Sequence, residues 1–465
     1  MNPDWELPFP QVGSGGLPIF RQDHAQYALF YAPGYVGVVA KEHSDEFENQ
    51  IGASSPPANP GAANLRNYAA QALQTWQSLY SRPFTPLCLT LYLNNRCNLA
   101  CTYCYSSAVP SSSETLGLDA IRSVAEIVLA NCQERSQPFT VVFHGGGEPS
   151  LEQSLADAAL SMLAQMGKER GVPLFRYIAT NGVMSAQRAM WLAANFDLIG
   201  LSCDGPEDIQ TSQRSLAAHG KNSTAAVERT AMIVHEAGTP LNVRVTLTAA
   251  TLARQPEIAE YICQKLKPLE IHVEVAYQGG RMQDSFAPDQ IEKFIVPFLE
   301  AREAARRYGV TWVSSGSRPA EIHGPYCNVL RDVINLAPGN LATACLKLSR
   351  AGQIRQAGLS IGESDPSGQF NLDLTQIEKI RQSLLNKLLP GCAACFNRFH
   401  CVRSCPDTCL LDEPLNVSDF RCAEQRLMTM ITLQEIARRL WSSTGAAGRA
   451  QGSAFLPVSK IIHYL

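Results

Sequence analysis

The chain has 465 residues, which is too many for one ordinary hydrophobic core and predicts two or three domains. Hydrophobic residues make up 45% and charged residues 17% of the chain, and the net charge is -3, so the composition argues against a basic surface for nucleic acid or membranes. The N-terminal stretch "MNPDWELPFPQVGSGG" lacks the basic and apolar regions of a signal peptide, and no apolar run long enough to span a membrane follows. We therefore expect a cytoplasmic protein without nucleic-acid or membrane partners.

Residues 1–84 are predicted to form a separate N-terminal segment. The runs "QYALFYAP" and "YVGVVA" flank a Pro-Gly pair and predict a hairpin, while "KEHSDEFENQI" and "NLRNYAAQALQTWQSLY" predict two helices. Between these helices, "SSPPANPGAA" has the composition of a linker. Such a segment either captures a peptide by strand addition or covers the next domain, and both alternatives stay open.

Strands and helices alternate over residues 85–315. The predicted strands are "PLCLTLYL", "FTVVFHGG", "LFRYIATNG", "FDLIGLSCDG", "LNVRVTLT" and "IHVEVAY", and a helix follows each of them. This makes six βα units, the pattern of a parallel sheet with covering helices. A partial barrel and a doubly wound sheet are both compatible with that pattern.

Polar motifs stand where the first four of these strands end. They are, in chain order, "NNRCNLACTYC", "HGGGEP", "TNG" and "CDGP". Ligands of parallel α/β folds bind at the carboxyl ends of the strands. The four motifs are therefore predicted to converge on one site.

The pattern changes after residue 315, and residues 316–440 are predicted to be a third domain. "VINLAPGNLATAC" predicts a hairpin that turns at Pro338-Gly339-Asn340. "LPGCAACFNRFHCVRSCPDTC" has too many cysteines and too few apolar residues for a core of its own, so inorganic cofactors are expected to hold it. "AEQRLMTMITLQEIARRLW" predicts a helix, and residues 441–465 form a tail with a small, polar stretch.

In a reducing compartment, 15 cysteines are not expected to form a disulfide framework. Cys97, Cys101 and Cys104 follow a CxxxCxxC pattern that turns three thiolates toward one metal centre and leaves one coordination position open. The alternative is a zinc site with His144 or another residue as fourth ligand. Four isolated cysteines are expected to be small buried hydrophobes. They are Cys88, Cys132, Cys203 and Cys263.

The CxxxCxxC pattern after a first strand, "GGGEP" after the second, and the βα repeat together resemble the radical S-adenosylmethionine (SAM) enzymes. The resemblance implies a partial (β/α)6 TIM-like barrel and a [4Fe–4S] cluster on the three cysteines, with SAM on the open iron. Reductive cleavage of SAM would then give a 5′-deoxyadenosyl radical that removes a hydrogen atom from the substrate. By the same resemblance, the residues that bind SAM are Tyr103, Gly145, Gly146, Gly147, Glu148, Ser202, Asp204 and Arg244.

The later cysteines resemble the SPASM extension of radical SAM enzymes, which holds two auxiliary iron–sulfur clusters. One cluster would be bound by Cys392, Cys395, Cys401 and Cys422. The other would be bound by Cys327, Cys345 and Cys405, with either Cys409 or an open iron in the fourth position. Five residues separate Gly339 from Cys345, one more than in the family pattern. Structural zinc is the alternative for this group.

SPASM-type enzymes mostly modify peptides or proteins, and the long N-terminal segment favours a maturase of ribosomally made (RiPP) peptides. The expected reaction is an oxidative crosslink in a precursor peptide with a leader, with flavodoxin or ferredoxin as electron donor. Glu274, Tyr277 and Asp332 are candidates for removing the second proton. The alternatives are an anaerobic sulfatase-maturating enzyme that forms formylglycine and a non-catalytic iron–sulfur or zinc protein.

Overall fold

The computed structural model describes most of the chain. It covers residues 9–218, 222–276, 279–282, 286–287, 290–316, 321–322, 328, 330–365, 368–386, 392, 394–401, 420–443 and 453–457. The chain divides into two compact units. Unit 1 comprises Met1–Arg82, Gly316–Tyr326 and Leu384–Leu465, and unit 2 comprises Pro83–Ser315 and Cys327–Ser383. This grouping differs from the four predicted segments, whose boundaries stay a prediction.

Unit 2 is built on an 11-stranded sheet with the strand order β10-β9-β8-β7-β6-β5-β4-β11-β12-β13-β14. From β10 to β11 all neighbouring strands are parallel. These strands are β4 (Cys88–Leu91), β5 (Phe139–Phe143), β6 (Leu174–Thr180), β7 (Leu198–Ser202), β8 (Leu241–Leu247), β9 (Glu270–Val275), β10 (Thr311–Ser314) and β11 (Val333–Ala337). The six predicted βα units are present, and β10 is a further strand that the sequence did not predict.

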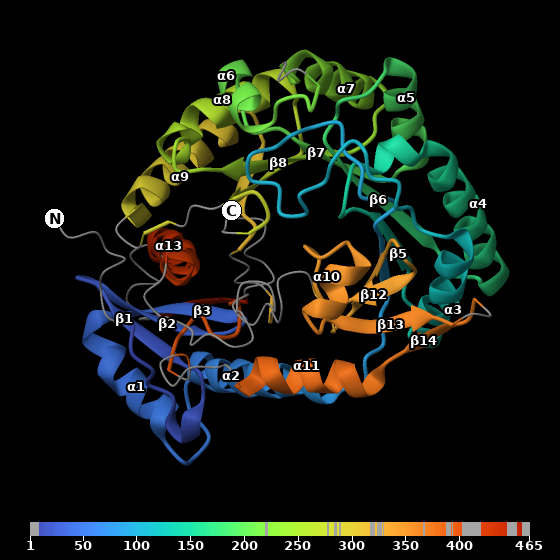
Figure 1. Ribbon diagram of the computed structural model, residues 1–465. Helices are drawn as coiled ribbons and strands as arrows, with labels where there is room; N and C mark the ends of the chain where they lie inside the picture. Colours follow the sequence, from blue (N-terminus) through green and yellow to red (C-terminus); the bar gives the residue numbers. More distant parts are fainter. Residues whose placement is uncertain are drawn as a thin grey trace. The chain divides into compact units, whose positions relative to one another are not determined.

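Helices connect these strands and cover one face of the sheet (Figure 1). They are α3 (Leu118–Glu134), α4 (Gln153–Arg170), α5 (Ala186–Asn195), α6 (Glu207–Gln213), α7 (Thr224–Glu236), α8 (Gln255–Lys265) and α9 (Ile291–Arg306). In β8 and β9, fully buried residues alternate with half-buried ones. Because side chains of a strand alternate between faces, one face is an apolar layer under the helices and the other is a partly accessible, more polar inner face.

The remaining strands of this sheet follow β11 as antiparallel neighbours. β11 and β12 (Leu341–Thr343) form the predicted hairpin, and Gly339 and Asn340 at its turn both have positive φ, +84° and +57°. Two of the three loop residues thus have positive φ, which explains the Gly-Asn pair, because glycine and asparagine adopt this conformation most readily. The other elements here are β13 (Ser360–Ser364), β14 (Phe370–Leu372), α10 (Ala351–Gln356) and α11 (Leu374–Asn386).

Unit 1 contains a four-stranded antiparallel sheet of order β1-β2-β3-β15. Its strands are β1 (Phe20–Asp23), β2 (Tyr27–Ala32), β3 (Tyr35–Ala40) and β15 (Ser453–Pro457), and its helices are α1 (Ser44–Gly52), α2 (Pro60–Ser81) and α13 (Phe420–Ser443). The predicted hairpin is confirmed as β2 and β3, which turn at Gly34 with a φ of +93°. Within the predicted linker, Asn59 accepts hydrogen bonds from the backbone of Gly61 and Ala62. Asn59 therefore caps α2, which begins at Pro60.

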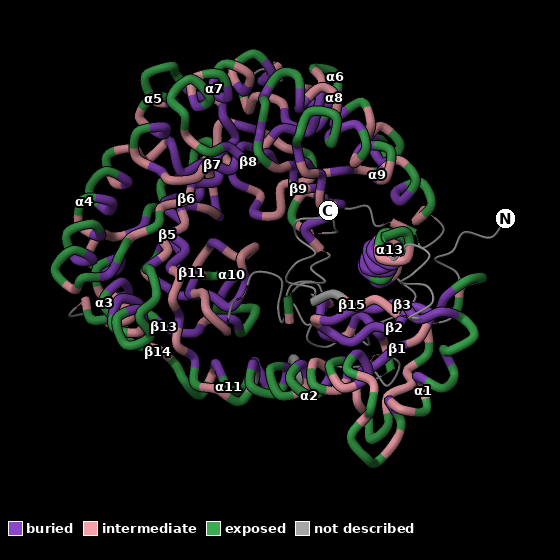
Figure 2. Tube along the Cα trace, turned by 180° about the vertical axis from the view of Figure 1, so that it is seen from behind, coloured by how far each residue is buried: buried purple, intermediate pink, exposed green. Residues whose placement is uncertain are grey.

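The sheet of unit 1 is apolar on both faces. Every residue of β2 and β3 is buried (Figure 2). One face packs with residues of α1 and α2, among them Phe47, Ile51 and Leu65. The other face packs with residues of α13, among them Met430 and Leu433. No helix in the described part of the chain is long and apolar enough to cross a membrane.

Candidate active site

The loop that carries Cys97, Cys101 and Cys104 follows β4 and is held by two other loops of unit 2. On one side, Gly147 N donates to Asn94 O (2.8 Å) and Glu148 N donates to Arg96 O (2.7 Å). On the other side, Ala100 N donates to Ser215 O and Thr102 N donates to Gln213 O, both at 2.9 Å. These backbone bonds fix the cysteine loop to the "HGGGEP" loop after β5 and to the end of α6 with the residues that follow it.

The three consecutive glycines after His144 have a steric reason. A Cβ on Gly145 would lie 2.5 Å from the ring of Tyr92, one on Gly146 would lie 2.4 Å from Asn94 O, and one on Gly147 would lie 2.0 Å from Arg96 O. Gly145 and Gly146 also have positive φ, +100° and +64°, which side chains disfavour. The glycines therefore let the β5 loop lie directly against the cysteine loop.

The carboxylate of Glu148 is buried and joins its own loop to the turn after β6. It accepts from Ser150 N (3.1 Å), from Thr180 Oγ1 (2.7 Å) and from Asn181 N (2.8 Å). The side-chain amide of Asn181 in turn donates to Asn98 Oδ1 (2.8 Å) and lies 3.7 Å from the Sγ of Cys97. The "TNG" turn after β6 thus contacts a cysteine of the CxxxCxxC pattern, which agrees with the predicted convergence of the strand-end motifs, although Asn181 itself was not among the predicted site residues.

The structure brings the three cysteines of this pattern together. Burial, followed by the negative charge of Glu148, raises the pKa of Cys97 to about 12, and the neighbouring thiols Cys101 and Cys104 add to that effect. Burial also raises the pKa of Cys101, while nearby Arg214 and Arg281 oppose this. All three side chains are half-buried. Sulfur ligands with hydrogen-bond donors beside them fit an iron–sulfur cluster.

A single metal ion and an iron–sulfur cluster need different arrangements of these thiols. Within the described residues, no three His, Cys, Asp or Glu side chains are arranged to hold one metal ion. A single zinc ion needs all its ligands at bonding distance from one point, whereas a cluster binds each cysteine to a different iron. His144, the fourth ligand considered for zinc, is half-buried at the end of β5, and burial lowers its pKa to about 3. The choice between a cluster and a single ion at these cysteines therefore stays a prediction.

Tyr103 and Asp204 belong to one buried polar network. Tyr103 donates its hydroxyl proton to Asp204 Oδ2 (2.6 Å) and accepts from Arg214 (2.6 Å). Asp204 also accepts from Gln213 Nε2 (2.8 Å) and from Thr246 N (3.0 Å). Burial, and then the opposing charges of Arg214 and Asp204, set the pKa of Tyr103 well above its usual value, so its hydroxyl stays protonated. The network joins the cysteine loop to β7 and β8.

Arg214 was not predicted, because it lies outside every motif. It is buried, and its Nε has no hydrogen-bond partner among the described residues. Its positive charge lowers the pKa of Cys101 against the effect of burial. A buried guanidinium beside a cysteine of the CxxxCxxC pattern places a permanent positive charge at the site.

Ser202 and Arg244 lie side by side on the inner face, paired across β7 and β8. Arg244 Nε donates to Tyr177 Oη at 3.3 Å. The pKa of Arg244 is raised most by Tyr177 and further by the negative charge of Glu274 on β9. Tyr105, next to Cys104, is close to the same groups, because burial, Cys104, Glu274 and Cys345 all raise its pKa. The inner face thus carries an arginine, a carboxylate and tyrosines next to the cysteine loop.

The candidates for proton removal are placed differently. Glu274 lies on β9 near its carboxyl end, and its Oε1 is buried without a hydrogen-bond partner among the described residues. Asp332 precedes β11 and accepts backbone hydrogen bonds from Leu87 and Cys88 at the start of β4, the opposite end of that strand from the cysteine loop. Tyr277 lies outside the described residues.

The cysteines predicted for the auxiliary clusters are described only in part. Cys395 N donates to Cys392 O (3.2 Å), and the pKa of Cys395 is raised by burial and further by the thiols of Cys422 and Cys392. Those three cysteines of unit 1 are therefore neighbours, and Cys401 is half-buried in the same unit. Cys345 is buried in unit 2. The remaining predicted ligands, Cys327, Cys405 and Cys409, lie outside the described residues.

Comparison with known proteins identifies the parallel-sheet region. Residues 91–262 match the radical SAM superfamily. A cysteine-type anaerobic sulfatase-maturating enzyme of Clostridium perfringens is 23% identical over 205 residues, which cover 43% of this chain and 55% of the relative. A PqqA peptide cyclase of Xanthomonas euvesicatoria is 25% identical over 228 residues, covering 48% of this chain and 56% of the relative. The chain thus spans about half the length of these relatives.

A solved structure supports the same assignment at the level of the fold. Native anSMEcpe with bound AdoMet superposes with a TM-score of 0.59 and 18% identity, covering 76% of this chain and 100% of that one. This similarity confirms the predicted partial barrel. Together with the match over residues 91–262, it confirms the resemblance found in the CxxxCxxC and "GGGEP" motifs.

Proposed function

The chain contains a radical SAM domain, and we propose that it is a radical SAM maturase that oxidatively crosslinks side chains of a ribosomally made precursor peptide. One observation carries the proposal. Three grouped, half-buried thiols stand on a loop that a glycine-rich loop and the "TNG" turn hold at the carboxyl edge of a parallel sheet. This edge is where parallel α/β folds bind their ligands.

Cys97, Cys101 and Cys104 would hold a [4Fe–4S] cluster whose fourth iron accepts SAM. When bound, the cluster and SAM supply an electron and a 5′-deoxyadenosyl radical, which abstracts a hydrogen atom from the substrate. The amide of Asn181 is positioned to donate toward the sulfur of Cys97. Such a contact stabilises negative charge on a cluster ligand and tunes the reduction potential.

The hydrogen bonds of the predicted SAM-binding residues indicate which part of SAM each residue would contact. Three protein donors already engage the Glu148 carboxylate, so we assign it to fixing the loop and assign the ammonium of SAM to the carbonyl oxygens of the glycines. The hydroxyl of Tyr103 is bonded to Asp204, so its ring would meet the adenine. Ser202 and Arg244 are proposed to contact the ribose and the carboxylate of SAM.

Glu274 is the proposed acceptor of the second proton. It lies near the carboxyl end of β9, its Oε1 is buried and unpaired among the described residues, and Arg244 lies close enough to feel its charge. A carboxylate that already has an internal hydrogen-bond partner at every lone pair would accept a substrate proton less readily. Replacing Glu274 by Gln should keep 5′-deoxyadenosine formation while abolishing the crosslinked product.

Oxidation of the substrate radical releases one more electron, and auxiliary clusters would accept it. We propose one such cluster on Cys392, Cys395, Cys401 and Cys422, supported by the proximity of three of them. The second would use Cys327, Cys345 and Cys405, with Cys409 as the candidate fourth ligand. Flavodoxin or ferredoxin is the proposed electron donor, and the cytoplasm is the compartment that provides it.

A second candidate reaction is formylglycine formation. The similarity to a sulfatase-maturating enzyme supports it, whereas the similarity to a PqqA peptide cyclase supports crosslinking. Residues 1–84 lie outside the superfamily match, and we propose that they bind the leader of a precursor. Such a role favours crosslinking of a precursor peptide over formylglycine formation.

The test is incubation of the reconstituted, dithionite-reduced protein with SAM and one of two substrates, followed by mass spectrometry. One substrate is a Cys- or Ser-containing sulfatase peptide, and the other is a short peptide encoded beside the gene. We expect a mass loss of two hydrogens in the second peptide and no formylglycine in the first. Formylglycine would assign the protein to sulfatase maturation instead. A chain in which Ala replaces Cys97, Cys101 and Cys104 is the control, and it should retain auxiliary iron.

A further inference from the structure

The cysteines proposed for one auxiliary cluster stand on two segments of unit 1. Residues 392–401 carry three of them and α13 carries the fourth; they are Cys392, Cys395, Cys401 and Cys422. Phe396 of the first segment packs with Phe20 of β1, with ring centroids 6.4 Å apart, and lies in the apolar core that α13 forms with the sheet. Phe399 packs edge-on against Trp76 of α2, with centroids 5.6 Å apart. Both cysteine-bearing segments are therefore anchored to the elements around the N-terminal sheet.

Tyr31 of β2 fixes the residue that precedes Cys401. Its hydroxyl is hydrogen-bonded to Nε2 of His400, and Nδ1 of His400 is hydrogen-bonded to the carbonyl oxygen of Glu321. Because a carbonyl oxygen can only accept, Nδ1 carries the ring proton and Nε2 accepts from the Tyr31 hydroxyl. Tyr31 and His400 are both buried, so this pair holds the backbone next to Cys401 against the sheet.

Asn397 connects the first segment to the helix that carries Cys422. Its Oδ1 accepts from Thr429 Oγ1 of α13 (2.8 Å), and both residues are buried. Burial raises the pKa of Cys395, and a hydrogen bond from the backbone of Asn397 to that thiol opposes the effect. Thr429 follows Cys422 by seven positions, about two helical turns, so both stand on the same side of α13. One residue thus ties the sulfur of Cys395 to the cysteine-bearing side of the helix.

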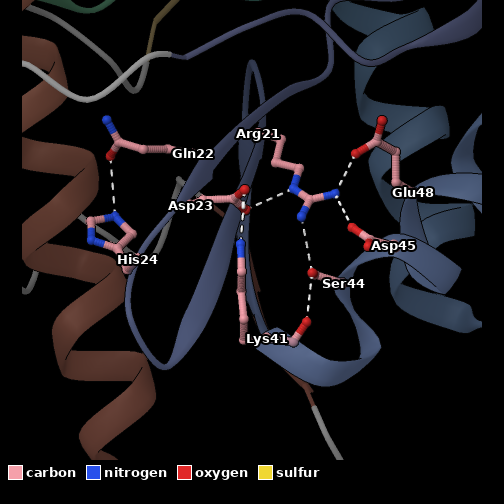
Figure 3. Close-up of polar contacts among 8 residues, drawn as sticks. All are labelled: Arg21, Gln22, Asp23, His24, Lys41, Ser44, Asp45 and Glu48. Carbon is pink, nitrogen blue, oxygen red and sulfur yellow. Dashed lines mark hydrogen bonds and ion pairs between the residues drawn. The ribbon is translucent and has the colours of Figure 1, made fainter.

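The sheet holds α13 by a buried polar contact as well as by apolar packing. Arg21 and Gln22 are neighbours on β1 and point to opposite sides of the strand (Figure 3). Arg21 Nη1 donates to Glu48 Oε2 of α1 (2.6 Å), whereas Gln22 Oε1 accepts from Gln434 Nε2 of α13 (2.9 Å). β1 therefore joins the helices on both faces, and the position of α13 depends on the N-terminal strands.

We propose that Tyr31 and Thr429 are positioning residues for the auxiliary cluster on the cysteines of these two segments. Tyr31 acts through His400, and Thr429 acts through Asn397. The inference rests on the auxiliary cluster of the proposed function, and it needs neither SAM nor a substrate. It gives the N-terminal sheet a role in cofactor binding, besides the proposed binding of a leader.

Such a site couples the cluster to the folding of the sheet. A group that binds only the folded arrangement of its ligands stabilises that arrangement, and the folded arrangement in turn strengthens binding of the group. The contacts of Tyr31 and Thr429 join the ligand segments to β2 and α13. Hydrogen exchange at the amides of β2 and β3 should therefore be slower in the iron-loaded chain than after a chelator has removed the iron.

The test counts the iron of this cluster alone. The parent chain has Ala at the three cysteines of the CxxxCxxC pattern, so that only auxiliary iron remains, and the share of this cluster is the iron lost when Cys395→Ala is added. The parent and its Tyr31→Phe and Thr429→Val variants are reconstituted and exposed to increasing concentrations of a chelator. Iron per chain and the electron paramagnetic resonance spectrum after dithionite reduction are measured. Both variants should show an altered spectrum and lose this iron at an about 10–100-fold lower chelator concentration, a typical cost of removing a partner that orients a metal ligand.

Two matched changes separate positioning from packing. Thr429→Ser keeps the hydroxyl and loses a methyl group, whereas Thr429→Val keeps the shape and loses the hydroxyl that bonds to Asn397. We expect parental iron retention and spectrum from Thr429→Ser. Tyr35→Phe is the control for Tyr31→Phe, because the Tyr35 hydroxyl accepts from Asn64 Nδ2 of α2 (3.2 Å), in the core on the other face of the same sheet. It should leave the auxiliary iron unchanged.

Several outcomes would overturn the inference. One is parental iron retention with an unchanged spectrum in both Tyr31→Phe and Thr429→Val. Others are an equal loss of iron in Tyr35→Phe and Tyr31→Phe, or better retention by Thr429→Val than by Thr429→Ser, because either would mean a loss of packing alone. Exchange in β2 and β3 that does not respond to iron would contradict the coupling. A parent chain without iron would overturn the proposed auxiliary clusters themselves, whereas failure of SAM cleavage would overturn the proposed reaction and leave this inference in place.

Discussion

Replacing Gly147 by Ala tests how the glycine loop positions the cysteine loop. The added Cβ would lie 2.0 Å from Arg96 O and 2.3 Å from Asn94 Oδ1, closer than side-chain carbons approach other atoms in folded proteins. Because the backbone donors of residues 147 and 148 bond to the same segment at 2.8 and 2.7 Å, the loops cannot separate without weakening both bonds. Overpacking costs about 1–3 kcal/mol, and each of the two weakened bonds up to about 1 kcal/mol, so we expect a loss of about 1–5 kcal/mol in unfolding free energy.

The assay is urea unfolding of the apo protein by circular dichroism, together with iron content and 5′-deoxyadenosine yield after reconstitution. Gly147→Ala should lower all three. Gly352→Ala in α10 is the matched control, because a Cβ there meets nothing within 4 Å, and it should be neutral or slightly stabilising. Wild-type stability and full SAM cleavage in Gly147→Ala would refute the idea that close contact between the two loops builds the site.

Three further changes probe the groups around the cysteine loop. Asn181→Ala removes the amide beside Cys97 and should lower the rate of 5′-deoxyadenosine formation by about 10–100-fold at unchanged iron content, measured by chromatography and a ferrozine assay. Tyr103→Phe leaves Arg214 without its hydroxyl acceptor, so the free energy of unfolding in urea should fall by about 1–3 kcal/mol. His144 has a pKa lowered to about 3 in the folded chain against 6.5 unfolded, so the unfolded state binds the extra proton and stability falls as pH drops through 6.5. Between pH 8 and 5.5 the apo wild type should therefore lose about 1.4 kcal/mol more than His144→Gln; an equal loss would contradict a neutral His144 in the folded chain.

Much of the fold of unit 2 follows from local pattern. The six strands were predicted from apolar runs such as "FTVVF" and "LNVRVTL", which agree with β5 and β8. β10 was missed because the four residues of Thr311–Ser314 are too short for periodicity to register. β15 was missed because it follows a run of small, polar residues, and only its pairing with β3 makes it a strand. Local sequence cannot show that pairing.

The candidate site was predictable where a motif is continuous in sequence. The grouping of the cysteines and the glycine loop both followed from short motifs. Asn181 is not among the predicted site residues, because its contact with Cys97 joins residues 84 positions apart. Arg214 has no motif at all, and it matters because folding buries it beside Tyr103 and Cys101. The steric role of the glycines also needed the structure, since their neighbours come from the preceding loop.

The most direct test of the central claim is SAM cleavage by the reconstituted protein without any peptide. The dithionite-reduced chain should convert SAM to 5′-deoxyadenosine and methionine, quantified by liquid chromatography and mass spectrometry. A chain with Ala at Cys97, Cys101 and Cys104 should give none while keeping the iron bound by its other cysteines. Absence of 5′-deoxyadenosine from the wild-type chain with its iron–sulfur absorbance intact would contradict the assignment of these three cysteines to a radical SAM centre.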